Sequence, residues 1–165
     1  MKKYVFLIVL AALTAFSCTV SEQTRQSRAE KKALLAQTIR QQVDERQYEI
    51  TVRQAFPLGG TPIMLTTPYS LTIIGDSINS YLPYFGRAWN VPYGGGKALN
   101  FTGHIRDYHS MWVSDQQVRI AIIVENEEDI YQYDVEVFLN GSAYINVSCR
   151  NRQTIGFSGE MRGEK

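Results

Sequence analysis

The stretch from Val118 to Val147, VRIAIIVENEEDIYQYDVEVFLNGSAYINV, decides the fold. Apolar and polar residues alternate along it, with two interruptions, NEED at 126–129 and LNG at 139–141. Alternation with a period of two places every second side chain on one face of a β-strand, and short polar interruptions are typical of hairpin turns. The stretch therefore predicts three consecutive antiparallel strands, each with one buried face.

The second turn can be tested for register, because opposite residues in a hairpin point to the same face. A two-residue loop at 140–141 would set buried and exposed faces opposite each other. A three-residue loop, 139–141, sets Val137 opposite Ala143 and keeps both apolar faces together. We therefore predict the three-residue loop, with Gly141 left-handed in a bulge.

Alternation of the same kind recurs upstream of this stretch. Apolar residues share one parity in two further segments: Tyr48, Ile50, Val52 and Phe56, and then Tyr69, Leu71 and Ile73. A two-residue loop at Gly75-Asp76 sets Ile73 opposite Ile78 and gives Gly75 a positive φ, so the apolar faces agree across that hairpin. The polar segment 114–116 predicts another hairpin turn.

Together these patterns predict about nine or ten strands between residues 47 and 158. Links this short leave no room for crossover helices, so the sheet must be antiparallel. The predicted fold class is therefore mainly β, a single antiparallel β-meander that closes into a barrel or splits into a sandwich.

One α-helix is predicted ahead of the strands, over about 27–45. Ser27 and Glu30 stand at capping-box spacing, and neither Gly nor Pro follows before Glu45. Its apolar residues form one stripe at four-residue spacing: Leu35, Ile39 and Val43. A narrow stripe indicates a single contact face. That face either packs on the chain's own barrel or binds a partner, as in a structural accessory subunit of an envelope complex.

The N-terminus has the pattern of a secretory signal peptide over residues 1–17. Lys2 and Lys3 precede an uncharged apolar run at 4–16. That run is too short for a membrane-spanning helix, which needs roughly 20 residues, and it suits the apolar region of a signal peptide. We therefore expect an exported protein whose mature chain begins at Cys18.

Two kinds of signal peptidase cut before Cys18. Residues 15–18, AFSC, resemble the lipobox of a bacterial lipoprotein, although Ala15 stands where Leu is usual. The alternative is an ordinary signal peptidase. With lipid on Cys18, residues 18–26 are expected to form a flexible polar tether to the membrane, and 27–161 to form a single domain.

Cys149 is the second of two cysteines. If Cys18 carries lipid, Cys149 has no disulfide partner; the competing interpretation is a Cys18–Cys149 disulfide, which an oxidising compartment permits. Removal of residues 1–17 takes away Lys2 and Lys3 but no acidic residue, so the formal net charge changes from +1 to −1. A near-neutral chain predicts no nucleic-acid partner.

Residues 81–96, YLPYFGRAWNVPYGGG, interrupt the strand pattern. Pro83 and Pro92 forbid a regular central strand, and a loop this long is uncommon unless it is functional or packed by its own side chains. As a platform for a small ligand, a glycan or a partner protein, it would use these residues: Tyr84, Phe85, Arg87, Trp89 and Tyr93. In the alternative interpretation the aromatics turn inward and plug one barrel end.

No catalytic signature is found in the sequence, and we predict no catalytic residue, no metal and no cofactor. His104, Asp107 and His109 are the nearest approach to a site, but on a regular strand His104 and His109 point to opposite faces. A hydrolase using Asp107 and His109 is the alternative. Ser77, in Asp76-Ser77-Ile78, matches a short bacterial O-glycosylation pattern on an expected turn.

Two segments carry a family resemblance: PLGGTPIMLTTPYSLTIIGDSINSYLPYFGRAWNVPYGGG at 57–96 and FLNGSAYINVSCRNRQTIGFSGEM at 138–161. With these, the chain resembles the lipoprotein family known as domain of unknown function 4251, common in Bacteroidota, over roughly residues 30–161. The resemblance implies a lipocalin-like or related antiparallel barrel, and a location on the periplasmic side or the surface of an outer membrane. It implies no catalytic residue, so we expect a non-catalytic, lipid-anchored cell-envelope binding domain.

Overall fold

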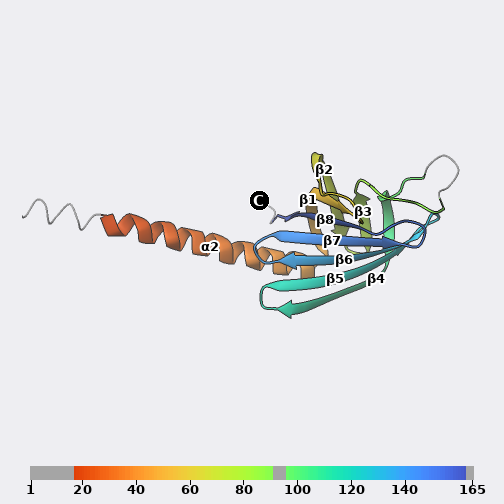
Figure 1. Ribbon diagram of the computed structural model, residues 1–165. Coiled ribbons are helices and arrows are strands. Elements are labelled where there is room, and N and C mark those ends of the chain that lie inside the picture. Colours follow the sequence, from red (N-terminus) through yellow and green to blue (C-terminus); the bar gives the residue numbers. More distant parts are fainter. Residues whose placement is uncertain (1–16, 91–95, 163–165) are drawn as a thin grey trace, which may run out of the picture. The chain divides into compact units, whose positions relative to one another are not determined.

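The computed structural model describes residues 17–90 and 96–162 (Figure 1). It contains one helix followed by strands: α2 (Ser17–Asp44), β1 (Gln47–Pro57), β2 (Ile63–Ile74), β3 (Ser77–Tyr81), β4 (Asn100–Ser114), β5 (Gln117–Glu125), β6 (Ile130–Phe138), β7 (Ser142–Cys149) and β8 (Ile155–Met161). Residues 35–44 of α2 belong to the same compact unit as the strands, whereas the part of α2 before Leu35 belongs to a separate unit.

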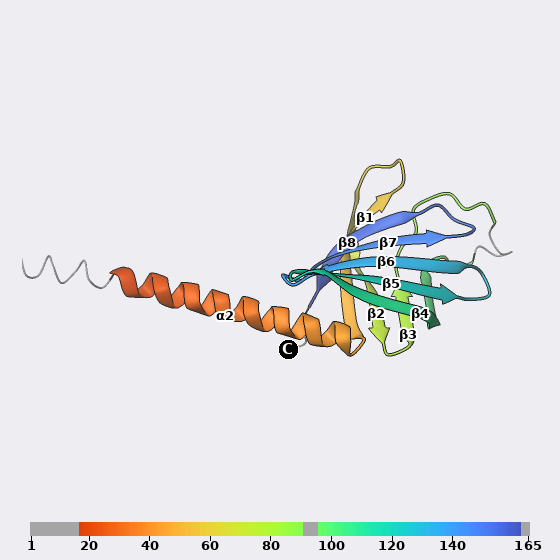
Figure 2. The same cartoon turned by 90° about the horizontal axis from the view of Figure 1, so that it is seen from below.

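The strands form a closed antiparallel barrel. Each strand pairs with the next in chain order, and β8 pairs with β1 to complete the circle (Figure 2). The predicted meander is thus confirmed, and it closes into a barrel instead of splitting into a sandwich. The described residues form eight strands, not the nine or ten expected, because β1 and β4 continue as single strands through shifts in register that interrupt the alternation.

The predicted turns have the predicted registers. Ile73 lies opposite Ile78 across the Gly75-Asp76 turn, where Gly75 has a φ of 58°. The turn after β6 has three residues, with Gly141 at a φ of 92°, and it sets Val137 opposite Ala143. The two hairpin registers follow from the local sequence, because the loop length in each turn is the one that keeps the apolar faces of the paired strands together.

A bulge in β1 corrects the expected facing of Phe56. The pairing with both neighbouring strands shifts between Val52 and Gln54. The extra residue, Arg53, reverses the parity of the strand beyond it. Ala55 therefore points into the barrel and is fully buried, while Phe56 points outward and is 36% exposed.

Side chains fill the barrel interior. Every strand contributes at least one inward residue that is no more than 8% exposed, for example Ile50, Leu71, Ile78, Phe101, Ile120, Tyr133, Ile145 and Phe157. The rings of Phe101 and Tyr131 pack with centroids 4.6 Å apart. An eight-stranded barrel is just wide enough for its own side chains, so this interior is the hydrophobic core of the protein.

The C-terminal part of α2 covers one end of the barrel. Ile39 and Val43 are fully buried in the core, with Leu35 packed beside them. Arg40 donates from Nη2 to the Asp115 carbonyl oxygen at 2.6 Å. The predicted stripe therefore packs on the chain's own barrel, and the exposed stripe that would have marked a structural accessory subunit is not present.

The helix begins earlier than the sequence suggested. α2 starts at Ser17, ten residues before the expected start at Ser27, so residues 18–26 are helical in this structure although they were expected to form a flexible tether. Neither Gly nor Pro occurs between Ser17 and Asp44 to interrupt the helix. No described helix is both long enough and apolar enough to cross a membrane.

The β8–β1 pairing predicts different costs for two glycine substitutions. A Cβ at Gly159 would collide with the Thr51 carbonyl oxygen, whereas a Cβ at Gly156 would sit 3.6 Å from the Phe56 Cβ, an ordinary contact. We expect Gly159→Ala to lower the free energy of unfolding by about 3 kcal/mol. Gly156→Ala, the matched control, should change it by less than about 1 kcal/mol. Urea denaturation measures both; equal stabilities would contradict the tight approach at Gly159.

Candidate functional site

The segment from Leu82 to Asn90 leaves β3 and lies at the barrel end remote from residues 35–44 of α2 (Figure 1). It begins at a buried contact, where the Leu82 amide donates to the Leu99 carbonyl at 3.3 Å. Both leucines belong to the core. Tyr93 and its neighbours at 91–95 lie outside the described residues.

Backbone hydrogen bonds fix this segment on the β7–β8 connection. The Trp89 amide donates to the Asn151 carbonyl, and the Gln153 amide donates to the Arg87 carbonyl, both at 2.9 Å. Ala88 thereby forms an antiparallel bridge with Arg152. Two bonds that flank the bridged residue hold the tip of the segment as a short strand would.

Tyr84 supports the same segment from within. Its hydroxyl lies 2.8 Å from the Arg87 carbonyl and 3.0 Å from the Gln153 carbonyl. Burial raises the pKa of the Tyr84 phenol, which keeps the hydroxyl protonated as a donor. A Cβ at Gly86 would lie 2.7 Å from the same hydroxyl oxygen. Any other residue at position 86 would therefore require the Tyr84 ring to shift.

The predicted site residues differ in exposure: one packs against the segment, and the others face outward. Tyr84 is half-buried, whereas Phe85 is 37% and Trp89 69% exposed, and Arg87 is exposed between them. Phe85, Arg87 and Trp89 are thus exposed, and we call them the loop surface; their use as a binding platform stays a prediction. Tyr84 turns inward, as in the alternative interpretation. Four of the five predicted residues lie in the described part of the chain, and their roles differ.

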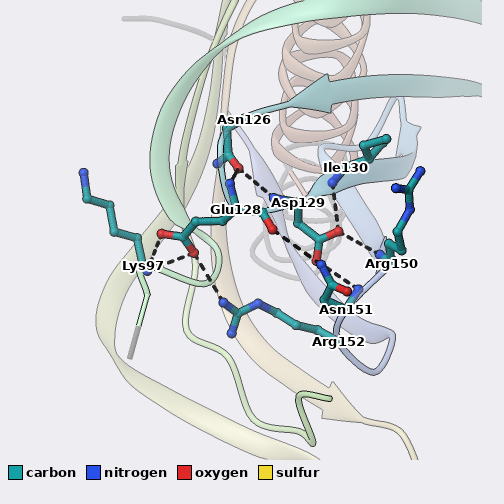
Figure 3. Close-up of polar contacts among 8 residues, drawn as sticks. All are labelled: Lys97, Asn126, Glu128, Asp129, Ile130, Arg150, Asn151 and Arg152. Atoms are coloured by element: carbon teal, nitrogen blue, oxygen red, sulfur yellow. Dashed lines mark hydrogen bonds and ion pairs between the residues drawn. The ribbon is translucent and has the colours of Figure 1, made fainter. Parts of the chain in front are cut away.

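A carboxylate network holds the β7–β8 connection to the β5–β6 turn (Figure 3). Asp129 is 7% exposed. Its two oxygens accept hydrogen bonds from the backbone amides of Ile130, Arg150 and Asn151 at 2.8, 3.1 and 3.0 Å. Asn126 Oδ1 accepts from the amides of Glu128 and Asp129 at 2.8 and 3.0 Å, which fixes the turn that carries the carboxylate.

Glu128 extends the network to the end of the β3–β4 loop. Its carboxylate accepts from the Lys97 amide at 2.9 Å and pairs with Arg152 at 3.3 Å (Figure 3). Arg152 is almost fully buried, and its guanidinium lies 5.7 Å from the ring centroid of Tyr84. Three loops therefore meet around one ion pair, in which Arg152 is buried and Glu128 partly buried, and the loop surface is held by one of these loops.

The sequence did not predict this network. Residues 126–129 were expected only to form a turn, and Arg152 was not singled out. The available signal was weak: Asn and Asp at the two ends of a tight acidic turn suit side-chain capping of backbone amides. The contacts of Asp129 with residues 150–151 depend on strand pairing, which periodicity alone does not place.

The histidines form no site within the described residues. A bulge at Arg106 reverses the parity of β4, so His104 and His109 both face outward, which corrects the expectation that they point to opposite faces. Asp107 pairs with Arg106 at 3.2 Å. No group of three or more metal-ligating side chains occurs in 17–90 or 96–162. Nothing in this arrangement favours the hydrolase alternative.

The modification sites remain predictions. Ser77 is exposed at the start of β3, as O-glycosylation requires. Cys18 lies in the first turn of α2. Cys149 is a free thiol in the structure and is partly buried at the end of β7.

Comparison with known proteins supports the fold. A family model described as "Domain of unknown function (DUF4251)" matches residues 30–161. A crystal structure of a DUF4251 family protein from Bacteroides eggerthii is 13% identical, covers 79% of this chain and 89% of its own, and superposes with a TM-score of 0.60. No curated protein matches the chain. At this identity the likeness shows the fold alone.

The Asp129 network predicts a large effect for Asp129→Ala. The substitution leaves amides of residues 130, 150 and 151 without their acceptor, so the free energy of unfolding should fall by about 3 kcal/mol. Asp115→Ala, in the exposed turn after β4, removes a carboxylate for which no side-chain bond is seen in the described structure and should cost less than about 0.5 kcal/mol. Urea denaturation compares them; similar losses would contradict the role of Asp129.

The environment of Cys149 predicts that its thiol reacts slowly with thiol reagents. Burial raises its pKa from 9.0 to about 12, because the thiolate is disfavoured away from water. At pH 8 the folded protein should react with a thiol reagent at least about a hundredfold more slowly than the denatured protein. Cys149→Ala identifies the signal due to Cys149. A fast reaction in the folded state, or no free Cys149 in non-reduced denatured protein, would contradict this arrangement.

Proposed function

The chain belongs to the DUF4251 family, and we propose that it is an exported, lipid-anchored, non-catalytic domain that binds a protein partner of the cell envelope. The binding site is the loop surface of Phe85, Arg87 and Trp89. One observation carries the proposal: Trp89 is 69% exposed although its own amide and the Arg87 carbonyl are held by the β7–β8 connection.

An exposed tryptophan held in place is suited to association. Trp, Tyr and Arg are the residue types most enriched where substitution weakens protein complexes. A segment that is ordered before binding loses less conformational entropy when the complex forms. The bonds of Trp89 and Gln153 and the hydroxyl of Tyr84 provide that order in the unbound protein.

The filled barrel favours a partner on the outside over a small ligand within. Core side chains occupy the space in which larger-cavity barrels hold a small molecule. On the loop surface, Arg87 stands between two exposed aromatics, and this mixture of a cation with aromatic rings is typical of protein interfaces. A glycan that stacks on Trp89 is the other outcome of the experiment below.

The N-terminal sequence supports the proposed anchor. A charged start, an apolar run and the AFSC segment at 15–18 are arranged as in a lipoprotein precursor. Lipid on Cys18 would attach the domain to a membrane, on the periplasmic side or the surface of an outer membrane. Ser77, exposed at the start of β3, would be accessible to O-glycosylation there.

Site-specific crosslinking tests the partner. A photoreactive phenylalanine analogue replaces Trp89 in the full chain, and crosslinking is carried out in the cells that produce the protein. The same analogue in place of Ile74, which is 60% exposed on β2, is the matched control. We expect a discrete protein crosslink from position 89 and none from position 74. A crosslink to carbohydrate alone from position 89 would overturn the assignment to a protein partner.

Affinity then tests the role of Trp89. Trp89→Ala should weaken binding of the purified crosslinked partner at least about 30-fold, the loss of about 2 kcal/mol expected of a central interface residue. Its melting temperature should stay within about 2 °C of wild type, because an exposed side chain contributes little to folding. Unchanged affinity of Trp89→Ala for the partner, or a large fall in the melting temperature of the unbound variant, would contradict the proposal.

A further inference from the structure

A groove on the outer face of the barrel has the chemistry of a sugar site. We propose that this groove, formed over β5 to β8 and β1, binds a neutral pyranose residue of an oligosaccharide. Its volume is about 490 Å³, within the range of roughly 300–1,000 Å³ typical of small-molecule sites. It contains no residue of the loop surface, so it is a second site independent of the proposed partner.

Strand pairing aligns the outward-facing groove residues in two rows, the second of which continues to Ser158 beside the groove. The first row crosses four neighbouring strands through the partners Asp134, Asn146, Gly156 and Phe56. The second row runs beside it through Arg119, Glu136, Tyr144 and Ser158. Members of one row point to the same side of the sheet. The groove is therefore built from rigid strands and not from loops.

Gly156 opens the groove. It leaves a gap in the first row between the side chains of Asn146 and Phe56, where any other residue would place a Cβ. The aromatic residues beside this gap are exposed, Phe56 by 36% and Tyr144 by 52%. Tyr144 packs nearly perpendicular to Phe138, with ring centroids 6.3 Å apart.

The lining is amphipathic in the way that a sugar ring requires. A pyranose presents C–H groups on its faces and hydroxyl groups around its rim. The faces of Tyr144 and Phe56 offer apolar surface for the C–H groups, while Asp134 and Asn146 offer acceptors and a donor for the hydroxyls. Within the described structure no hydrogen bond is seen for the Tyr144 hydroxyl or the Asn146 amide, so both are available to a ligand.

The charges favour a neutral ligand. Glu136 is already engaged, because Arg119 donates to one of its oxygens at 2.8 Å and Gln117 to the other at 3.2 Å. Asp134 receives only the Gln132 amide, at 3.3 Å or longer. The groove lining thus contains two carboxylates and one guanidinium, and the guanidinium is already paired with Glu136. This excess of carboxylates disfavours an acidic sugar.

Binding of defined oligosaccharides to the full chain tests the proposal. The probes are maltohexaose, cellohexaose and chitohexaose as neutral ligands and hexagalacturonate as the acidic one, each titrated by calorimetry. We expect at least one neutral hexasaccharide to bind, more tightly than hexagalacturonate. Tyr144→Ala should weaken that binding at least about tenfold, because the ring loses its apolar surface.

Two further variants separate occupancy of the groove from other effects. Gly156→Val fills the gap while Tyr144 stays in place, and it should also weaken binding at least about tenfold. Ile74→Ala, the matched loss of an exposed apolar side chain on β2, should stay within about twofold of wild type. Trp89→Ala should likewise keep the sugar affinity, so failure of the loop surface and failure of the groove are distinguishable.

Three results would overturn the sugar site. One is the absence of heat for every neutral hexasaccharide up to about 10 mM, which corresponds to an affinity too weak for a specific site. Another is wild-type affinity in both Tyr144→Ala and Gly156→Val, each with a melting temperature that shows an intact fold. The third is tighter binding of hexagalacturonate than of any neutral probe.

Discussion

The pairing of β8 with β1 is the constraint on which the rest of the structure depends. It closes the barrel, so no described strand is left at an open edge of the sheet. The closure requires Gly159, because the Thr51 carbonyl occupies the space of a side chain. It also brings Phe56 beside Gly156 on the outer face. One pairing therefore creates both the filled core and the groove outside it.

A closed and filled barrel leaves its ends and its outer face to interact with other molecules. Residues 35–44 of α2 cover one end with Ile39 and Val43, so their apolar surface serves folding. At the other end, three kinds of contact hold the segment from Leu82 to Asn90. They are its backbone hydrogen bonds, the hydroxyl of Tyr84, and the loops around Arg152. What that segment exposes is thus fixed in the unbound state.

The sequence predicted the parts of the fold that local chemistry determines. The hairpins around Gly75 and Gly141 followed from one test, the agreement of apolar faces. The number of strands and the facing of Phe56 were wrong, because a bulge such as that at Arg53 adds one residue with no signature of its own. The Asp129 network was missed for a different reason: its acceptors and donors lie more than twenty residues apart and meet only after the barrel closes.

The same limit explains why the aromatic loop allowed two interpretations. Tyr84 and Trp89 lie five residues apart in a segment with one composition, yet one is a support and the other a surface. The difference comes from two carbonyl groups of the β7–β8 connection. The Gln153 carbonyl accepts from the Tyr84 hydroxyl and so holds that ring inward, whereas the Asn151 carbonyl accepts from the Trp89 amide and leaves its ring outside. In an aromatic-rich loop, partners distant in sequence therefore determine which rings are buried. In this barrel they hold Tyr84 half-buried and leave Phe85 and Trp89 exposed.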